Sequence, residues 1–178
     1  MWKEGTMTPN TIKLLARYNV RANTEMGRVL AQLADEEWNR ALGGYYPSIR
    51  SLCSHLFIAD FAWLRRFTNL RPFAYAQHPI FEGNPTWGGM LFPSFLDYDA
   101  DRKALDECLT QFAEEVTSEN LSQRLHYKDF KGIDQDRELG GLILHMFNHQ
   151  THHRGMIALY LDILGKDNDF SNLLALVD

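Results

Sequence analysis

Cysteine is scarce in this chain of 178 residues: only Cys53 and Cys108 occur, and neither belongs to a Cys-x-x-Cys pair. Two isolated cysteines exclude a disulfide framework, so we expect both to be small buried residues in a reducing compartment. The sequence also lacks a run of about 18 apolar residues, and its N-terminus, MWKEGTMTPN, contains no apolar signal segment. These absences predict a cytoplasmic protein that has no membrane partner.

A basic excess is lacking as well. The chain carries 18 lysine and arginine residues against 23 aspartate and glutamate residues, a net charge of −5, and the two signs are interspersed. No basic face is therefore expected to neutralise phosphates, and nucleic acid is not a predicted partner. Hydrophobic residues make up 45% of the chain and aromatic residues 12%, which is enough for one sizeable core, so residues 1–178 are expected to form a single domain.

Two helical patterns occupy the first part of the chain. The first is opened by Thr8 as N-cap and Pro9 in the first turn. Its apolar side chains recur at heptad spacing and are Ile12, Leu15, Ala22, Met26, Val29 and Leu33. The second pattern starts at Pro47 and extends to Phe67, and His55 lies on its apolar stripe. The second helix is thus expected to carry a histidine on its inner face.

Two further helices are predicted in the second half of the chain. The third follows Asp99. The last extends from about Arg137, after Asp136 as N-cap, to Leu164, and Gly165 ends it. Four amphipathic helices predict an all-α protein, a four-helix bundle.

The segments between these helices have their own patterns. Residues 69–98 are rich in proline and glycine, yet they also contain Phe73, Tyr75, Phe81, Trp87, Phe92 and Phe95. Disordered linkers lack such aromatic residues, so this long loop is expected to pack on the bundle. A weak alternation around Lys131 and Gly132 predicts a short β-hairpin before the last helix.

Histidines are concentrated near the end of the chain, where LHMFNHQTHHRGM holds four of the seven. His149 and His153 are four residues apart on the buried stripe of the last helix, so their imidazoles can converge on one point. Two adjacent neutral imidazoles satisfy each other's hydrogen bonds poorly, and a shared cation resolves that conflict. With His55 as a third ligand, the pattern predicts a three-histidine metal site with open positions, as in catalytic metal centres.

Each histidine also has an interpretation other than metal binding. A lone inner histidine such as His55 is more often a hydrogen-bonded core residue than a ligand, and the pair on the last helix is what favours the ligand interpretation. His145 and His152 are expected to support the ligands rather than bind the metal, whereas His78 and His126 are expected to face solvent.

A comparison with zinc proteases fails at one position. The string HQTHH matches His-Glu-x-x-His except that Gln150 replaces the general base, and a neutral amide cannot accept a proton from metal-bound water. Peptide hydrolysis by that route is not expected.

No residue stands out as the general base, and His152, Asp60 and Tyr160 are the candidates. Asn19 interrupts the stripe of the first helix and either hydrogen-bonds a metal ligand or caps a neighbouring backbone.

Three segments carry a family resemblance: YNVRAN in the first helix, SLCSHLFIADFAWLRR in the second and NHQTHHRG in the last. Together they resemble the DinB/YfiT-like family of candidate metalloenzymes over nearly the whole chain. The resemblance implies a four-helix bundle with a crossover connection, and a divalent metal ion, commonly zinc or nickel, bound by His55, His149 and His153. Relatives include S-transferases and isomerases that use low-molecular-weight thiols. This chain has Met156 where the family usually has glutamine, so a polar contact near the site is lost.

These inferences give hypotheses of two classes. In the first, the metal acts as a Lewis acid on a thiol or on water, in a thiol-dependent S-transferase or in a small-molecule hydrolase. In the second, the chain is a non-catalytic metal-binding stress protein. A homodimer is expected in either case, because the tail FSNLLALVD is apolar on one side and the loop from Phe73 to Phe95 offers more apolar surface than one bundle easily covers.

Overall fold

A computed structural model describes residues 7–177 of the chain. Its helices are α1 (Pro9–Leu30), α2 (Asp35–Asn39), α3 (Ile49–Phe67), α4 (Phe95–Glu115), α5 (Ser118–Ser122) and α6 (Leu139–Ile163). Its strands are β1 (Arg124–Lys128) and β2 (Asp134–Glu138), and its short 3-10 helices are η1 (Ala74–Gln77), η2 (Pro79–Glu82) and η3 (Leu174–Leu176). The long helices are four, as the sequence predicts.

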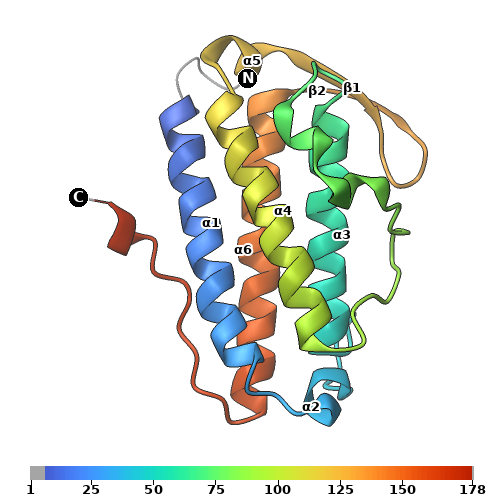
Figure 1. The fold of residues 1–178 in the computed structure, drawn as a ribbon, viewed down its shortest axis with the longest axis vertical. Helices are drawn as coiled ribbons and strands as arrows, with labels where there is room; N and C mark the ends of the chain where they lie inside the picture. Colours follow the sequence, from blue (N-terminus) through green and yellow to red (C-terminus); the bar gives the residue numbers. More distant parts are fainter. Residues whose placement is uncertain (1–6, 178) are drawn as a thin grey trace.

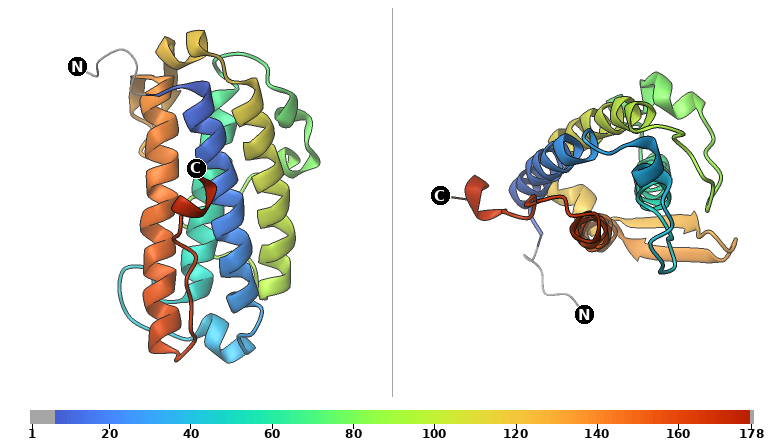
Figure 2. Two further views of the ribbon diagram at one scale, coloured as in Figure 1. Left: turned by 90° about the vertical axis from the view of Figure 1, so that its left-hand side faces the viewer. Right: turned by 90° about the horizontal axis from the view of Figure 1, so that it is seen from below.

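The four long helices form a bundle in which α3 and α4 run in the same direction (Figure 1). Around the bundle the order of neighbours is α1, α4, α3 and α6, so that α3 packs between α4 and α6 (Figure 2). Two parallel neighbours cannot be joined by a short turn, and the chain between them therefore runs back along the length of the bundle (Figure 1). The predicted bundle with a crossover connection is confirmed.

Local capping chemistry decides where the helices begin. Thr8 caps α1 as predicted, with its hydroxyl accepting a hydrogen bond from the backbone N–H of Thr11. The predicted start of the second helix at Pro47 is wrong, because α3 begins at Ile49. Ser48 is its N-cap, and Ser48 and Ser51 exchange reciprocal side-chain to backbone hydrogen bonds.

The starts of the other two long helices also differ from the prediction. Helix α4 begins at Phe95 rather than after Asp99, because Ser94 and Asp97 form a capping box one turn earlier. Helix α6 begins at Leu139, because Asp136 and Arg137 belong to β2 and pair with β1 instead of capping the helix. Its end is as predicted, with Gly165 at a positive φ of 70°.

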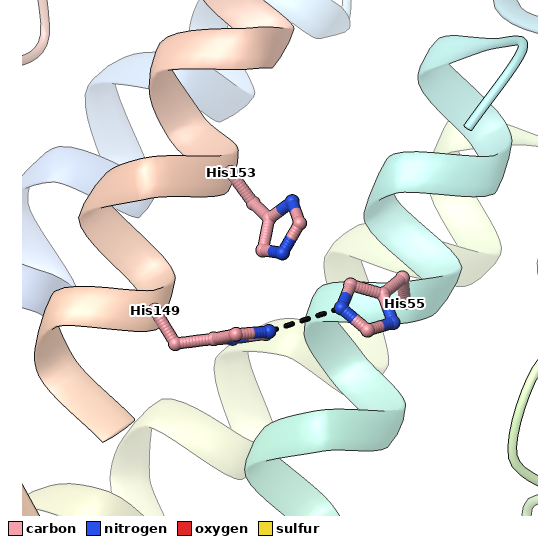
Figure 3. A group of neighbouring side chains, drawn as sticks. All are labelled: His55, His149 and His153. Atoms are coloured by element: carbon pink, nitrogen blue, oxygen red, sulfur yellow. Dashed lines mark hydrogen bonds between the residues drawn. The ribbon is translucent and has the colours of Figure 1, made fainter. Parts of the chain in front are cut away.

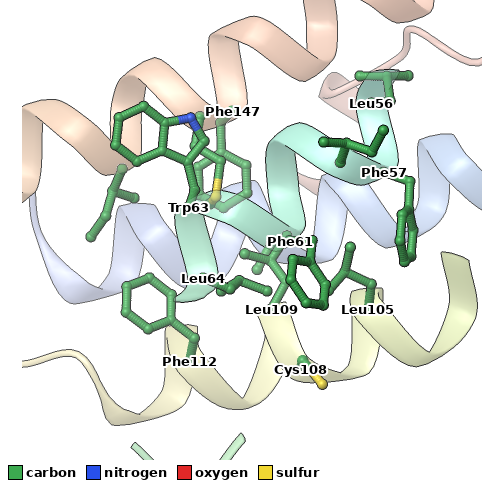
Figure 4. Packing of buried hydrophobic residues seen from close by; sticks show 14 of the residues in the cluster. Leu56, Phe57, Phe61, Trp63, Leu64, Leu105, Cys108, Leu109, Phe112 and Phe147 are labelled. Atoms are coloured by element: carbon green, nitrogen blue, oxygen red, sulfur yellow. The ribbon is translucent and has the colours of Figure 1, made fainter. Parts of the chain in front are cut away.

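The crossover loop packs on the bundle, as its aromatic content predicts. Phe73, Tyr75 and Phe92 are buried, and the Tyr75 hydroxyl donates a hydrogen bond to the carbonyl of Leu64. These side chains extend a core in which residues of α3 and α4, such as Phe61 and Leu109, lie together (Figure 4). Because these side chains are buried, the crossover loop is held in place where it passes over the outer side of α3.

The hairpin and the tail occupy opposite sides of α6 (Figure 2). Strands β1 and β2 pair antiparallel with Leu125 opposite Arg137, which confirms the predicted hairpin. The tail returns past α1, where the Tyr18 hydroxyl donates a hydrogen bond to the carbonyl of Ser171. None of the helices within residues 7–177 is long and apolar enough to cross a membrane.

Candidate metal centre

Three histidines meet between α3 and α6 (Figure 3). Because α3 and α6 are antiparallel neighbours, the middle of one helix faces the middle of the other (Figure 1). His55 extends from α3, and His149 and His153 extend from successive turns of α6 toward it (Figure 3). The structure thus brings together the three residues that the sequence singled out, and no other such group of metal-binding side chains is found in the described part of the chain.

The three imidazoles are close enough to share one ion. One ring nitrogen from each residue lies within 4.8 Å of the others, and the Nε2 atoms of His55 and His149 are 3.0 Å apart. The ring of His153 stands edge-on to that of His55, with 4.6 Å between centroids. His55 and His153 are buried, and His149 is half-buried.

Burial keeps these imidazoles neutral. It lowers the pKa of His55 to about 4 and that of His153 to about 4, because a charged ring loses its hydration there. The pKa of His149 falls to about 3 through burial and through repulsion by neighbouring histidines. Neutral imidazole is the form that binds a metal, so the set is ready to bind at neutral pH.

The hydrogen-bonding needs of the cluster support a metal site. A direct contact between two neutral imidazoles uses only one donor, and the buried Nδ1 atoms of His149 and His153 have no partner among the described residues. Buried polar atoms without partners are rare in native proteins. A cation shared by the three rings removes this deficit, and the donor set of three imidazoles suits zinc or nickel. The residues therefore fit a divalent metal ion.

Two aromatic residues lie against the cluster, and the first of them, Tyr46, was not singled out from the sequence. The ring of Tyr46, from the segment before α3, stacks on His55 at 4.4 Å between centroids and meets His153 edge-on. Trp87, from the crossover loop, meets His55 edge-on at 5.3 Å. The loop therefore not only packs on the bundle, as expected, but also contributes one wall of the site.

A pocket of about 290 Å³ opens beside His149. It lies between α3, α6, the crossover loop and the hairpin, and we call it the aromatic pocket; its lining consists of Ala59, Trp63, Arg66, Trp87, Tyr127, Asp129, Phe130, His145 and His149. Its size is at the lower end of the range for small-molecule sites, and apolar walls with few polar groups are typical of them. Of the three clustered histidines, His149 lines this pocket, so the cluster adjoins through it a space of small-molecule size.

The remaining histidines lie outside the cluster. His145 and His152 are both exposed: His145 lines the aromatic pocket and meets Trp63 edge-on, and the ring of His152 lies 4.8 Å from that of His153. His126 is exposed, as expected. The expectation that His78 faces solvent is only partly right, because this side chain is half-buried and accepts a hydrogen bond from the backbone N–H of Ile80.

Behind the histidines lies a buried polar network that joins all four long helices. Its members are Asn19 and Asn23 from α1, Asp60 from α3, Arg102 and Asp106 from α4, and Gln150 and Arg154 from α6. Arg102 lies between both carboxylates, with Nη1 2.7 Å from Asp60 and Nη2 2.8 Å from Asp106. On the other side, Arg154 donates hydrogen bonds to the amide oxygens of Asn19 and Gln150. The network fixes the helix on which two of the three histidines lie.

The network corrects the expectation for Asn19 and gives Gln150 a role. Asn19 neither contacts a metal ligand nor caps a backbone, because it donates to Asp106 and accepts from Arg154. Gln150 points into the bundle and donates to Asp60, away from the position that a protease general base would occupy. Its polar side chain is therefore used for packing helices rather than for chemistry at the metal.

The candidate general bases are mostly placed elsewhere. Asp60 is buried within the network, where burial raises its pKa to about 6 against the opposing effect of Arg102. Tyr160 donates to the backbone carbonyls of Gly43 and Tyr46 and so holds the segment before α3. His152 is the one of the three beside the cluster.

Comparison with known proteins shows to which family the chain belongs. The sequence model of the DinB family matches residues 7–175. The chain belongs to the DinB family. It is 23% identical to Protein DinB of Bacillus subtilis (strain 168) over 155 residues, which cover 83% of this chain and 82% of that protein.

The bundle also resembles a solved member of the DinB group. The crystal structure of a DinB-like protein from Bacillus cereus ATCC 10987 aligns with a TM-score of 0.61 over 87% of this chain and 93% of that one. The identity is 17%, so this likeness establishes the DinB-like fold alone. The family resemblance inferred from the sequence is confirmed by the family model rather than by this structural likeness.

Proposed function

We propose that this DinB-family protein is a metal-dependent enzyme that activates a thiol for transfer to a small electrophilic substrate. The observation that carries the proposal is the adjacency of the His55, His149 and His153 cluster to the aromatic pocket. A purely structural metal site is usually closed by four protein ligands, whereas this cluster offers three and opens on a space for a small molecule.

The three histidines would hold a divalent ion, zinc or nickel, as neutral ligands. When bound there, the ion supplies a Lewis acid that lowers the pKa of a thiol or of water. Neutral imidazoles would add no negative charge, so the site would keep the net positive charge of the ion, while Tyr46 and Trp87 cover His55. The protein thus provides a half-enclosed site with one open side.

The thiol must come from outside the chain. Cys53 and Cys108 are both buried, and burial raises the pKa of Cys108 to about 11 and that of Cys53 further. Neither forms a thiolate at neutral pH or reaches the pocket. A diffusible low-molecular-weight thiol is therefore the co-substrate of the proposed reaction.

Conjugation of small thiols tests this function. Zinc- or nickel-loaded protein, incubated with cysteine, glutathione or a related thiol and 1-chloro-2,4-dinitrobenzene, should form the thioether about tenfold faster or more than the His149→Ala variant. The His126→Ala variant alters an exposed histidine of the hairpin and should match the wild-type rate.

The same assay separates the other classes. Hydrolysis of a small ester or amide without thiol dependence would replace the transferase by a metal-dependent hydrolase. If neither rate exceeds that of His149→Ala over a broad panel of substrates, the chain is a non-catalytic metal-binding protein.

We further propose that the protein forms a homodimer. Large apolar side chains remain exposed on α6 and in the tail, namely Leu159, Ile163, Leu174 and Val177. Light scattering at micromolar concentration should give twice the 20.6 kDa of one chain. The double variant Leu159→Glu with Ile163→Glu should halve that mass, and a wild-type mass of one chain would contradict the proposal.

A further inference from the structure

The aromatic pocket contains one cation, Arg66, that forms no ion pair within the described residues, although the nearby carboxylate of Asp129 attracts it. Its walls are the rings of Trp63, Trp87, Tyr127 and Phe130, and Arg66 extends into it from α3. The Arg66 guanidinium lies 4.9 Å from the ring centre of Trp63 and 5.3 Å from that of Tyr127. Among residues 7–177 it forms no hydrogen bond and no ion pair.

The neighbouring arginine behaves differently. Arg65 is exposed, and its guanidinium donates to the side chain of Asn84 and to the carbonyl of Phe81. It is engaged with the crossover loop and does not line the pocket. Stacking on rings leaves the in-plane N–H groups of Arg66 free, and a planar fork of N–H donors matches the two oxygens of a carboxylate.

The acidic residue of the pocket is already used. Asp129 accepts hydrogen bonds from the backbone N–H groups of Lys131 and Ile133 and from the side chain of Gln135. These contacts build the turn of the hairpin and hold Phe130 at the pocket. Asp129 therefore has a structural role in the turn, and it attracts the Arg66 guanidinium without forming an ion pair with it.

Arg66 lies at the far end of the pocket from the histidine cluster. Eleven residues of α3 separate it from His55, about 16 Å of helix, and a helical side chain leans back toward the N-terminus by part of that distance. His149 lines the pocket at the cluster end, and His145, which meets Trp63, lines it one helical turn away. A ligand that spans it must be elongated.

We propose that Arg66 anchors the carboxylate of an elongated ligand whose aromatic or otherwise planar body stacks in the aromatic pocket. The ligand would lie between Trp63 on one side and Trp87 and Phe130 on the other. The rings of Trp87 and Phe130 stack on each other with 5.3 Å between their centroids. The orientation of its reactive end toward His149 rests on the proposed function, but the carboxylate anchor itself does not. The substrate class is thus an aromatic carboxylic acid rather than a neutral or cationic aromatic compound.

Matched probes test the anchor by titration calorimetry. The probes are 4-phenylbutyrate and 4-phenyl-1-butanol, which share one body and differ in the charged end. Wild-type protein should bind the acid about tenfold more tightly than the alcohol or better, the effect of one charge-assisted pair. In Arg66→Gln the acid should lose that advantage while the affinity for the alcohol stays within about twofold, which also shows that the pocket is intact. Arg65→Gln is the control and should retain the full preference.

The titrations are made on zinc-loaded protein and again after chelation of the metal, because a carboxylate can also bind to a metal ion. A preference for the acid that survives chelation and disappears in Arg66→Gln supports the anchor. A preference that disappears on chelation and is unchanged in Arg66→Gln places the carboxylate at the metal and overturns the anchor, while it supports the metal site. Equal affinities of wild-type protein for acid and alcohol overturn the anchor as well, whatever the outcome for the metal.

Discussion

Substitution of Arg102 by methionine should lower the free energy of unfolding by about 3–5 kcal/mol. The arginine is buried between Asp60 and Asp106, and without it two carboxylates remain in the core with their main counterion removed. Since a domain of this kind has a total stability of about 5–15 kcal/mol, this loss is a large fraction of the total. Urea or thermal denaturation followed by circular dichroism measures the change.

Two further variants test whether the loss of stability comes from the buried network. Lys103→Met removes the adjacent residue of α4, whose pair with Asp99 is exposed, and it should change stability by less than about 1 kcal/mol. Adding Asp60→Asn to Arg102→Met removes one uncompensated charge and should restore part of the loss. A loss below about 1 kcal/mol for Arg102→Met alone would show that the network does not hold the helices as its geometry indicates.

The sequence predicts the helices better than their first residues. Heptad spacing and the Thr8–Pro9 pair located α1, and Gly165 located the end of α6, because each of these signals is local. The starts of α4 and α6 were predicted wrongly for two reasons. For α4, the cap Ser94 lies among aromatic residues in a segment whose sequence pattern indicates a loop. For α6, the pairing of β2 with β1 overrides the capping preference of Asp136.

The histidine cluster was predictable for the same reason as the helices. His149 and His153 are one turn apart and His55 lies on the inner face of another helix, so periodicity marks all three as inward-facing, and the packing of α3 against α6 brings them together. Trp63 and Arg66 also continue the His55 and Ala59 side of α3 at helical spacing, a signal that was available in the sequence. It becomes informative only once the neighbour of that face is known.

The rest of the site depends on contacts between segments far apart in the chain. Trp87 reaches His55 from an irregular loop, and Phe130 reaches Trp87 from the turn of a hairpin. Neither contact has a periodicity that a sequence can display. The polar residues Asn19 and Arg154 are visible in the sequence as exceptions on apolar faces, but their partners lie on other helices, and their roles follow only from the packing.

Loss of any one of His55, His149 or His153 should weaken zinc binding by more than about 100-fold. Removal of a residue that merely supports a ligand costs about 10–100-fold, and removal of a ligand itself should exceed that. Purified wild-type protein should hold about one divalent ion per chain. Competition with a chromophoric chelator gives the affinity of each alanine variant, and His152→Ala, which alters the exposed neighbour of His153, should bind zinc within about tenfold of wild type.

The pH dependence of zinc binding distinguishes this buried cluster from exposed histidines. Protons compete with a metal only as the pH falls through the pKa of the ligand, and the pKa values here are about 4 for His55, about 3 for His149 and about 4 for His153. Affinity should therefore change little between pH 7 and pH 5, whereas three exposed imidazoles with a pKa of about 6.5 would lose it steeply over that interval. A steep loss below pH 6.5 in the wild type would show that the imidazoles are hydrated in the metal-free protein. The cluster would then have to be assembled by the ion, because burial would no longer hold its rings neutral beforehand.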